Sequence, residues 1–135
     1  KAFSSFYAGD YDSAAWLYSQ LWVKWDDGGR GEVPIGWAIN SELSLRFPLI
    51  FSRLYDTATE FDVFISGDSG AGYLNPTQLL PPRSPSGIKD SSAALWESWN
   101  QRYYHQFNLS FTGFIINGAA GKMTPAAEAI YAAFS

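Results

Sequence analysis

The feature that most constrains the fold of this chain is a strand-like segment followed by a helix-like segment, repeated four times. Apolar runs typical of buried strands cover residues 3–8, 33–39, 61–66 and 109–116. Each run precedes a segment with apolar side chains at helical spacing. This alternation predicts an α/β fold with a parallel sheet and right-handed crossovers. A complete eight-unit barrel needs about 250 residues, so four β-α units predict half of a (β/α) barrel.

Local signals set the expected limits of the helices. Asp12 or Ser13 is expected to cap the first helix, and Ser41 the second. Pro48 lies within the second helical segment and predicts a break or a kink there. Thr124, which precedes a proline, predicts the start of the last helix.

Length and composition limit the classes of protein to which the chain can belong. Its 135 residues, of which 47% are hydrophobic, predict a single globular domain over residues 1–135. The net charge is −4 and the basic residues are scattered, so we expect no nucleic-acid partner. No apolar stretch approaches the roughly 18 residues of a membrane-spanning helix. Cysteine is absent, which excludes disulfides and thiolate ligands.

Two observations indicate that the chain is part of something longer. It starts at Lys1 and shows no signal-peptide pattern. A four-stranded sheet would also leave two edges without partners, and stable proteins normally cover such edges. We therefore expect a fragment of a larger protein, in which further segments of the same protein or neighbouring chains complete the sheet.

Polar residues gather at the carboxyl ends of the expected strands. Asp10, Asn40, Asp68 and Asn117 each follow the end of one strand. In parallel α/β folds these ends lie on one face, and binding sites form there. The sequence therefore predicts a functional site at that face.

The third strand leads into a glycine-rich loop, residues 67–76. Gly67, Gly70 and Gly72 permit positive φ angles and let a ligand approach the backbone closely. The loop also supplies candidate ligand-facing groups, which are Asp68, Ser69, Tyr73 and Asn75.

Residues 70–76, Gly-Ala-Gly-Tyr-Leu-Asn-Pro, resemble the signature of the GxGYxYP family, whose members are described as "putative glycoside hydrolases". Segments 6–16 and 34–40 resemble the same family, so the similarity covers nearly the whole chain. The second tyrosine of the family motif is Asn75 here. The resemblance implies a barrel-like catalytic domain that handles extracellular polysaccharides.

Glycoside hydrolysis uses two carboxyl groups, one as the acid and the other as the base or nucleophile. Asp10 and Asp68 are the expected catalytic pair, with Asp12 as the substitute partner. The alternatives are structural: Asp12 would cap the first helix, and Asp10 and Asp68 would stabilise turns at strand ends. The glutamates lie on predicted helices or at strand starts and receive no role; they are Glu32, Glu42, Glu60, Glu97 and Glu128.

Aromatic residues make up 18% of the chain, and their rings can cover the apolar faces of sugars. Tyr11, Trp37 and Tyr73 are the expected stacking residues, and core packing is the alternative for Trp37. The predicted substrate-binding residues are Tyr11, Trp37, Asn40, Ser69, Gly70, Gly72, Tyr73, Asn75 and Asn117.

Two other chemistries have weaker support. A serine nucleophile in the loop at Ser69 would need His105 as its base, and His105 is expected near the end of a helix, away from that loop. Strand-end oxygens could bind a hard cation such as calcium, but no ligand-loop spacing supports a metal. We expect neither a metal nor a cofactor.

The sequon Asn108-Leu109-Ser110 makes Asn108 a candidate for N-glycosylation and favours a secreted or cell-surface protein. The sequence thus predicts hydrolysis of an extracellular polysaccharide or glycan. The alternative is a non-catalytic carbohydrate-binding or structural component of an extracellular assembly. A carboxyl separation of about 5 Å would indicate a retaining hydrolase, and about 6.5–9.5 Å an inverting one.

Overall fold

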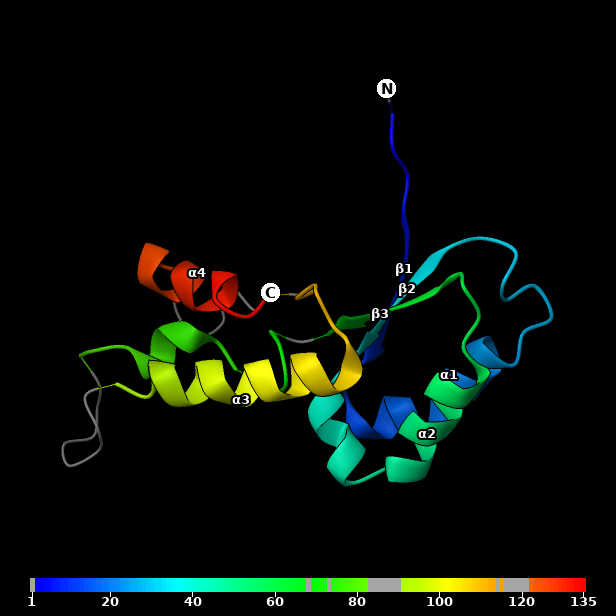
Figure 1. The fold of residues 1–135 in the computed structure, drawn as a ribbon, viewed down its shortest axis with the longest axis horizontal. Coiled ribbons are helices and arrows are strands. Elements are labelled where there is room, and N and C mark those ends of the chain that lie inside the picture. Colours follow the sequence, from blue (N-terminus) through cyan, green and yellow to red (C-terminus); the bar gives the residue numbers. More distant parts are fainter. Residues whose placement is uncertain (1, 68, 73, 83–90, 114, 116–121) are drawn as a thin grey trace.

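The computed structural model describes residues 2–67, 69–72, 74–82, 91–113, 115 and 122–135 (Figure 1). Its strands are β1 (Phe6–Tyr11), β2 (Ile35–Ile39) and β3 (Asp62–Ser66). Its helices are α1 (Ala14–Trp25), α2 (Pro48–Thr57), α3 (Ala93–Phe107) and α4 (Pro125–Ala132), with two 3₁₀ helices, η1 (Ser41–Leu45) and η2 (Pro76–Leu79). None of the helices in these ranges is long and apolar enough to span a membrane. The predicted α/β class is confirmed.

The three strands form one parallel sheet in the order β1-β2-β3, which is their order along the chain. Ala8, Trp37 and Phe64 lie side by side across it. β1 lies three residues later than the predicted range 3–8. The reason is that β2 begins only at Ile35, the partner of Phe6, so the residues before Phe6 have no strand to pair with.

The expected fourth strand is reduced, in the described residues, to a single bridge beside β3. Thr112 forms an isolated parallel bridge with Ser66. The N–H of Ser66 donates to the carbonyl of Phe111 at 2.9 Å, and the N–H of Gly113 donates to the carbonyl of Ser66 at 2.6 Å. The segment therefore lies where a fourth strand would lie. Residues 114 and 116, which belong to the predicted strand, are outside the described ranges.

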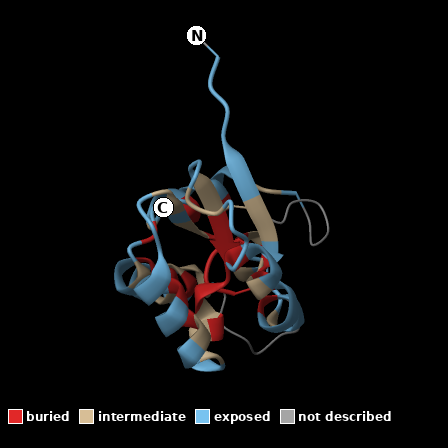
Figure 2. Ribbon diagram, turned by 90° about the vertical axis from the view of Figure 1, so that its right-hand side faces the viewer, coloured by how far each residue is buried: buried red, intermediate tan, exposed pale blue. Residues whose placement is uncertain are grey.

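α1 and α2 pack on the same face of the sheet, and the core lies between them and the strands (Figures 1 and 2). Consecutive strands are neighbours, so right-handed crossovers that advance in one direction place both helices on one side. Trp25 of α1 packs edge-on against Trp37, with ring centroids 5.0 Å apart, and stacks on Phe64 at 5.9 Å. The buried cluster comprises Tyr11, Leu17, Leu21, Trp25, Trp37, Ile39, Leu43, Phe51 and Leu54.

The helix starts follow the local signals, with one correction. Ser13 caps α1, because its Oγ accepts the backbone N–H of Trp16 at 3.2 Å. Asn40, and not Ser41 as predicted, caps η1: its Oδ1 accepts a backbone N–H two residues later at 3.1 Å. The helical segment breaks as predicted, since η1 ends before Pro48, which begins α2. α4 likewise begins at its proline.

Candidate functional site at the strand ends

β1 ends in a distorted segment that presents an acid to solvent. The register with β2 slips between Ala8 and Tyr11, and Asp10 takes a left-handed conformation with a φ of +70°. Asp10 is exposed, whereas Tyr11 is buried. Burial raises the pKa of Tyr11, and the charge of Asp10 raises it further. Asp10 is therefore an accessible carboxylate close to the Tyr11 hydroxyl.

Asp12 lies where the loops after β1 and β3 meet. A Cβ atom added to Gly67 would lie 3.4 Å from the Cβ of Asp12 and 3.3 Å from the carbonyl oxygen of Ala38. The N–H of Gly67 donates to the carbonyl of Ile39 at 2.8 Å. The carboxyl ends of all three strands thus converge around Gly67, and Asp12 is half-buried at this point.

The glycine-rich loop packs beneath α3. The N–H of Ala71 donates to Oδ1 of Asn100 at 2.7 Å, and Nε1 of Trp99 donates to the carbonyl of Ala71 at 2.9 Å. A Cβ atom on Gly70 would lie 2.3 Å from the same Asn100 oxygen. Gly70 and Gly72 are buried and have φ angles of +112° and +127°. Close packing against α3 therefore accounts for these glycines, and their predicted contact with substrate stays a prediction.

Two amides that the sequence assigns to substrate binding are buried and cap helices. Asn40 caps η1, and Asn75 caps η2 because its Oδ1 accepts the N–H of Thr77 at 2.9 Å. Only 3% of Asn75 is exposed. Ser69, another predicted ligand-facing residue, is also buried and has a φ of +65°. Capping explains both asparagines without a ligand.

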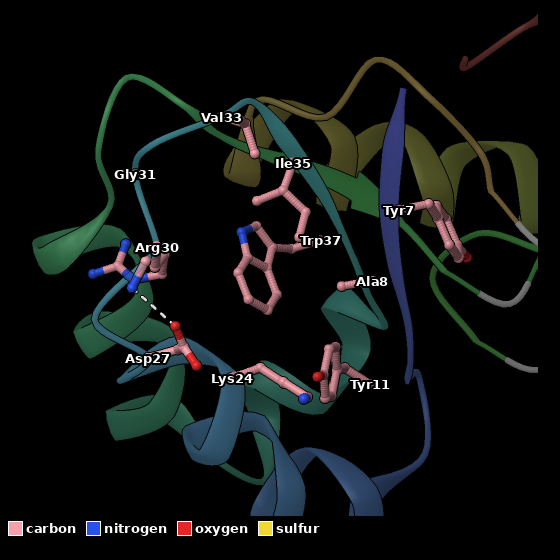
Figure 3. A pocket seen from close by; sticks show the side chains of 11 residues that line it. Tyr7, Ala8, Tyr11, Lys24, Asp27, Arg30, Gly31, Val33, Ile35 and Trp37 are labelled. Atoms are coloured by element: carbon pink, nitrogen blue, oxygen red, sulfur yellow. Dashed lines mark hydrogen bonds between the residues drawn. The ribbon is translucent and has the colours of Figure 1, made fainter. Parts of the chain in front are cut away.

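Trp37 belongs to the core and also forms the floor of a pocket (Figure 3). The pocket is a hollow of about 430 Å³ between β1, β2 and the loop after α1. Lys24 and Tyr11 lie on one side of it, and Asp27 and Arg30 on another. Because Trp37 is only 2% exposed, core packing is its main role. Tyr11 and Trp37, two of the predicted substrate-binding residues, both line this pocket.

A charged network fixes the indole of Trp37. Its Nε1 donates to Oδ1 of Asp62 at 2.8 Å, and Nη1 of Arg30 lies 2.5 Å from Oδ2 of the same carboxylate. Burial tends to raise the pKa of Asp62, but hydrogen bonds from Thr59 and Trp37 and the charge of Arg30 outweigh it and lower that pKa. The Arg30 guanidinium also lies 4.3 Å from the ring centroid of Trp25. These contacts make the network a structural support for the core.

Glu42 is a strand-end carboxylate that the sequence analysis leaves without a role. It lies on η1, three residues after the end of β2, and its Oε2 would be 3.5 Å from a Cβ atom on Gly72. Burial raises the pKa of Tyr103, Arg102 lowers it, and the Glu42 charge raises it. The short spacing between Asn40 and Glu42 is the signal that could have identified it, because strand-end acids follow a strand within a few residues.

Buried polar groups occur in the same region, since Ser41 precedes Glu42 in the chain and Trp96, like Glu42, contacts Gly72. Among the described residues, Oγ of Ser41, Nε1 of Trp96 and the hydroxyl of Tyr103 have no hydrogen-bond partner. Trp96 packs on Gly72, with ring atoms 3.6 Å from the position of an added Cβ. Hydroxyl and indole groups of this kind are suited to hydrogen bonding with a polar ligand.

The remaining predicted residues differ in their placement. Asn108 ends α3 in a left-handed conformation with a φ of +49° and is exposed, so its glycosylation stays a prediction. Three predicted site residues lie outside the described ranges: Asp68, Tyr73 and Asn117.

A parallel sheet with helices on one face and acids at its strand ends belongs to the α/β domains that form their sites at the carboxyl edge. The chain itself belongs to the GxGYxYP family. Residues 1–135, its whole length, match the family described as "GxGYxYP putative glycoside hydrolase C-terminal domain". The resemblance expected from residues 70–76 is thus confirmed.

The fold is also similar to that of a solved protein from Bacteroides thetaiotaomicron VPI-5482, whose crystal structure is described as that of "a putative hydrolase". The TM-score is 0.62 and the sequence identity 22%. The match covers 78% of this chain and 19% of that one, so the chain spans about a fifth of that relative. The comparison with curated proteins gave no match.

Proposed function

We propose that this chain carries the strand-end carboxyl groups of a glycoside hydrolase that acts on an extracellular polysaccharide or glycan. Membership of a family described as glycoside hydrolases supports the reaction class. The observation that carries the proposal is the convergence of the strand-end loops, which brings Asp12 against Gly67 at the end of β3. This hydrolysis requires two carboxyl groups that flank the scissile bond.

In the proposed mechanism one carboxyl group protonates the glycosidic oxygen, and another acts as base or nucleophile. Asp10 and Asp68 form the first candidate pair, with Asp12 as the substitute. Glu42 is added from the structure, because it lies beside Gly72 and near buried donors of the same region. Tyr73 and Asn117, which lie outside the described ranges, stay proposed sugar contacts, whereas Tyr11 belongs to the buried core cluster.

We also propose that the sheet is part of a (β/α) barrel. The side chain of Tyr7 on β1 reaches the segment around Thr112 that lies beside β3. A Cβ atom added to Gly113 would lie 3.3 Å from Cε2 of Tyr7. In a flat sheet three strand spacings of about 4.8 Å, or about 14 Å in total, would separate these positions. A tyrosine side chain does not reach that far, so the sheet curves towards the face opposite α1 and α2. That is the curvature of a barrel with external helices. A secreted or cell-surface location is proposed with this function.

The second candidate function is carbohydrate binding without catalysis. One observation favours it: the position of the second motif tyrosine is held by Asn75, whose side chain is buried and caps η2. A cap of this kind offers no ring on which a sugar can stack. The carboxyl groups at the strand ends would then only hydrogen-bond to sugar hydroxyls.

A panel of glycans tested for binding and for hydrolysis with the complete gene product distinguishes the two functions. We expect Asp68→Asn to abolish turnover while binding persists, since the amide keeps the shape and cannot ionise. We expect the same of one of Asp10→Asn, Asp12→Asn and Glu42→Gln, which identifies the partner of Asp68. Glu60→Gln is the matched control, because Glu60 is exposed and lies before β3, at the opposite end of the sheet. Binding without turnover in the unaltered protein would favour the non-catalytic function. Full turnover in all four variants would refute the proposed site.

A further inference from the structure

The sheet face opposite α1 and α2 is apolar and open. Side chains alternate along a strand. Ala8, Trp37 and Phe64 face the helices. Tyr7 and Val63 come one position earlier in β1 and β3, so they face the other way. Both are 49% exposed, and Figure 3 shows the Tyr7 side chain projecting on the other side of β1 from Trp37.

This face contains a hollow of about 580 Å³ whose described lining residues carry no charge. Phe111 is among those residues, and it is 66% exposed. Large contiguous apolar surfaces of soluble proteins usually mark an interface. A Cβ atom added to Gly36 would lie 3.4 Å from Cδ1 of Ile65, so Ile65 already packs over Gly36 on this face. The face therefore has the chemistry of an interior that is only half filled.

The adjoining edge of the sheet is also unprotected along residues 6–9 of β1, whereas Asp10 and the irregular register protect its carboxyl end. Among the described residues, β1 pairs with β2 alone. Proteins normally protect a free edge with a proline, a charge or a covering element. β1 has neither a proline nor a charge between Phe6 and Gly9. Its free edge is therefore suited to pairing with another strand.

We propose that a further segment of the same polypeptide, outside residues 1–135, adds a strand at β1 and packs apolar side chains on the face around Tyr7 and Val63. The curvature of the sheet towards this face makes it the inside of a barrel, which only additional strands can close. The matched family is a C-terminal domain, and the chain matches only 19% of its solved relative, so relatives have the additional chain that this requires. The proposal does not depend on hydrolytic activity.

Cysteine labelling tests this proposal, because residues 1–135 contain no cysteine. The complete gene product, with any cysteines elsewhere replaced by serine, is prepared as Val63→Cys and as Leu49→Cys. Leu49 is the control, since it is 83% exposed on α2. Each rate of reaction with a maleimide-linked polymer is divided by the rate for the same variant in denaturant. We expect the ratio for Val63→Cys to be at least tenfold lower than for Leu49→Cys. Ratios within twofold of each other would overturn the proposal.

Tyr7→Cys, on the same face of the edge strand β1, provides a second probe should Val63→Cys fail to fold. Light scattering on the same samples gives the oligomeric state, which distinguishes a segment of the same polypeptide from a second copy as the covering partner. Protection in a monomer, without added ligand, supports a segment of the same polypeptide. Protection that is lost when a dimer dissociates on dilution overturns the proposal in favour of a second copy. Protection that requires an added oligosaccharide overturns it in favour of a sugar site on this face.

Discussion

Replacing Gly70 by alanine tests whether the signature glycines serve packing or ligand approach. The new Cβ atom would lie 2.3 Å from Oδ1 of Asn100. That oxygen accepts the N–H of Ala71 at 2.7 Å, while Nδ2 of the same side chain donates to the carbonyl of Trp96 at 2.8 Å. Asn100 is fully buried. It therefore cannot rotate away from the clash without leaving buried polar groups unpaired.

The expected loss of stability has two parts. An alanine at a φ of +112° costs about 1–2 kcal/mol of backbone strain. Loss of the Asn100 hydrogen bonds in a buried site costs about 1–3 kcal/mol more. The sum is roughly 2–5 kcal/mol in the free energy of unfolding. Gly72→Ala is the matched control. Its φ is +127°, but the nearest described atom, Oε2 of Glu42, would be 3.5 Å from the new Cβ atom, so only the strain of about 1–2 kcal/mol applies.

Urea unfolding followed by tryptophan fluorescence measures both variants against the unaltered protein. Gly28→Ala serves as a neutral reference, because an added Cβ atom there meets no atom within 4 Å. If Gly70→Ala is no less stable than Gly72→Ala, the packing explanation is refuted. Loss of sugar binding in a Gly70→Ala protein of unchanged stability would instead support close approach of a ligand to this backbone.

Two further perturbations probe the supports of the site. Asp62→Asn should lower the free energy of unfolding by roughly 1–3 kcal/mol at pH 7, because Arg30 loses a charged acceptor. Since folding lowers the pKa of Asp62, this stabilisation is complete above its ordinary pKa of about 4 and is lost as the pH falls through the lower folded value. Urea titrations should therefore show the difference between the two proteins shrinking at low pH, and a constant difference would contradict the reasoning. Asn75→Ala should cost about 0.5–2 kcal/mol in thermal unfolding by removing the η2 cap, and Asn75→Ser should recover most of the loss; equal effects of the two substitutions would argue against capping.

Short-range features of this protein could be predicted from its sequence. The alternation of strands and helices, the break before Pro48 and the start of α4 depend on side-chain periodicity, capping groups and the fixed φ of proline. These signals act within one or two helical turns. The placement of acids at strand ends follows from the same reasoning, because parallel strands end at one edge of a sheet.

The roles of several site residues were decided by tertiary structure. Gly70 and Gly72 read as ligand-facing in sequence, yet α3, which begins some twenty residues later, covers them with Trp96 and Asn100. Glu42 reads as an ordinary helix residue, yet η1 holds it beside Gly72. The partner in each case comes from a distant part of the chain. Periodicity records which side chains of a segment turn inwards, but it carries no information about which distant element covers them, and that packing determines whether a group is buried or open to a ligand.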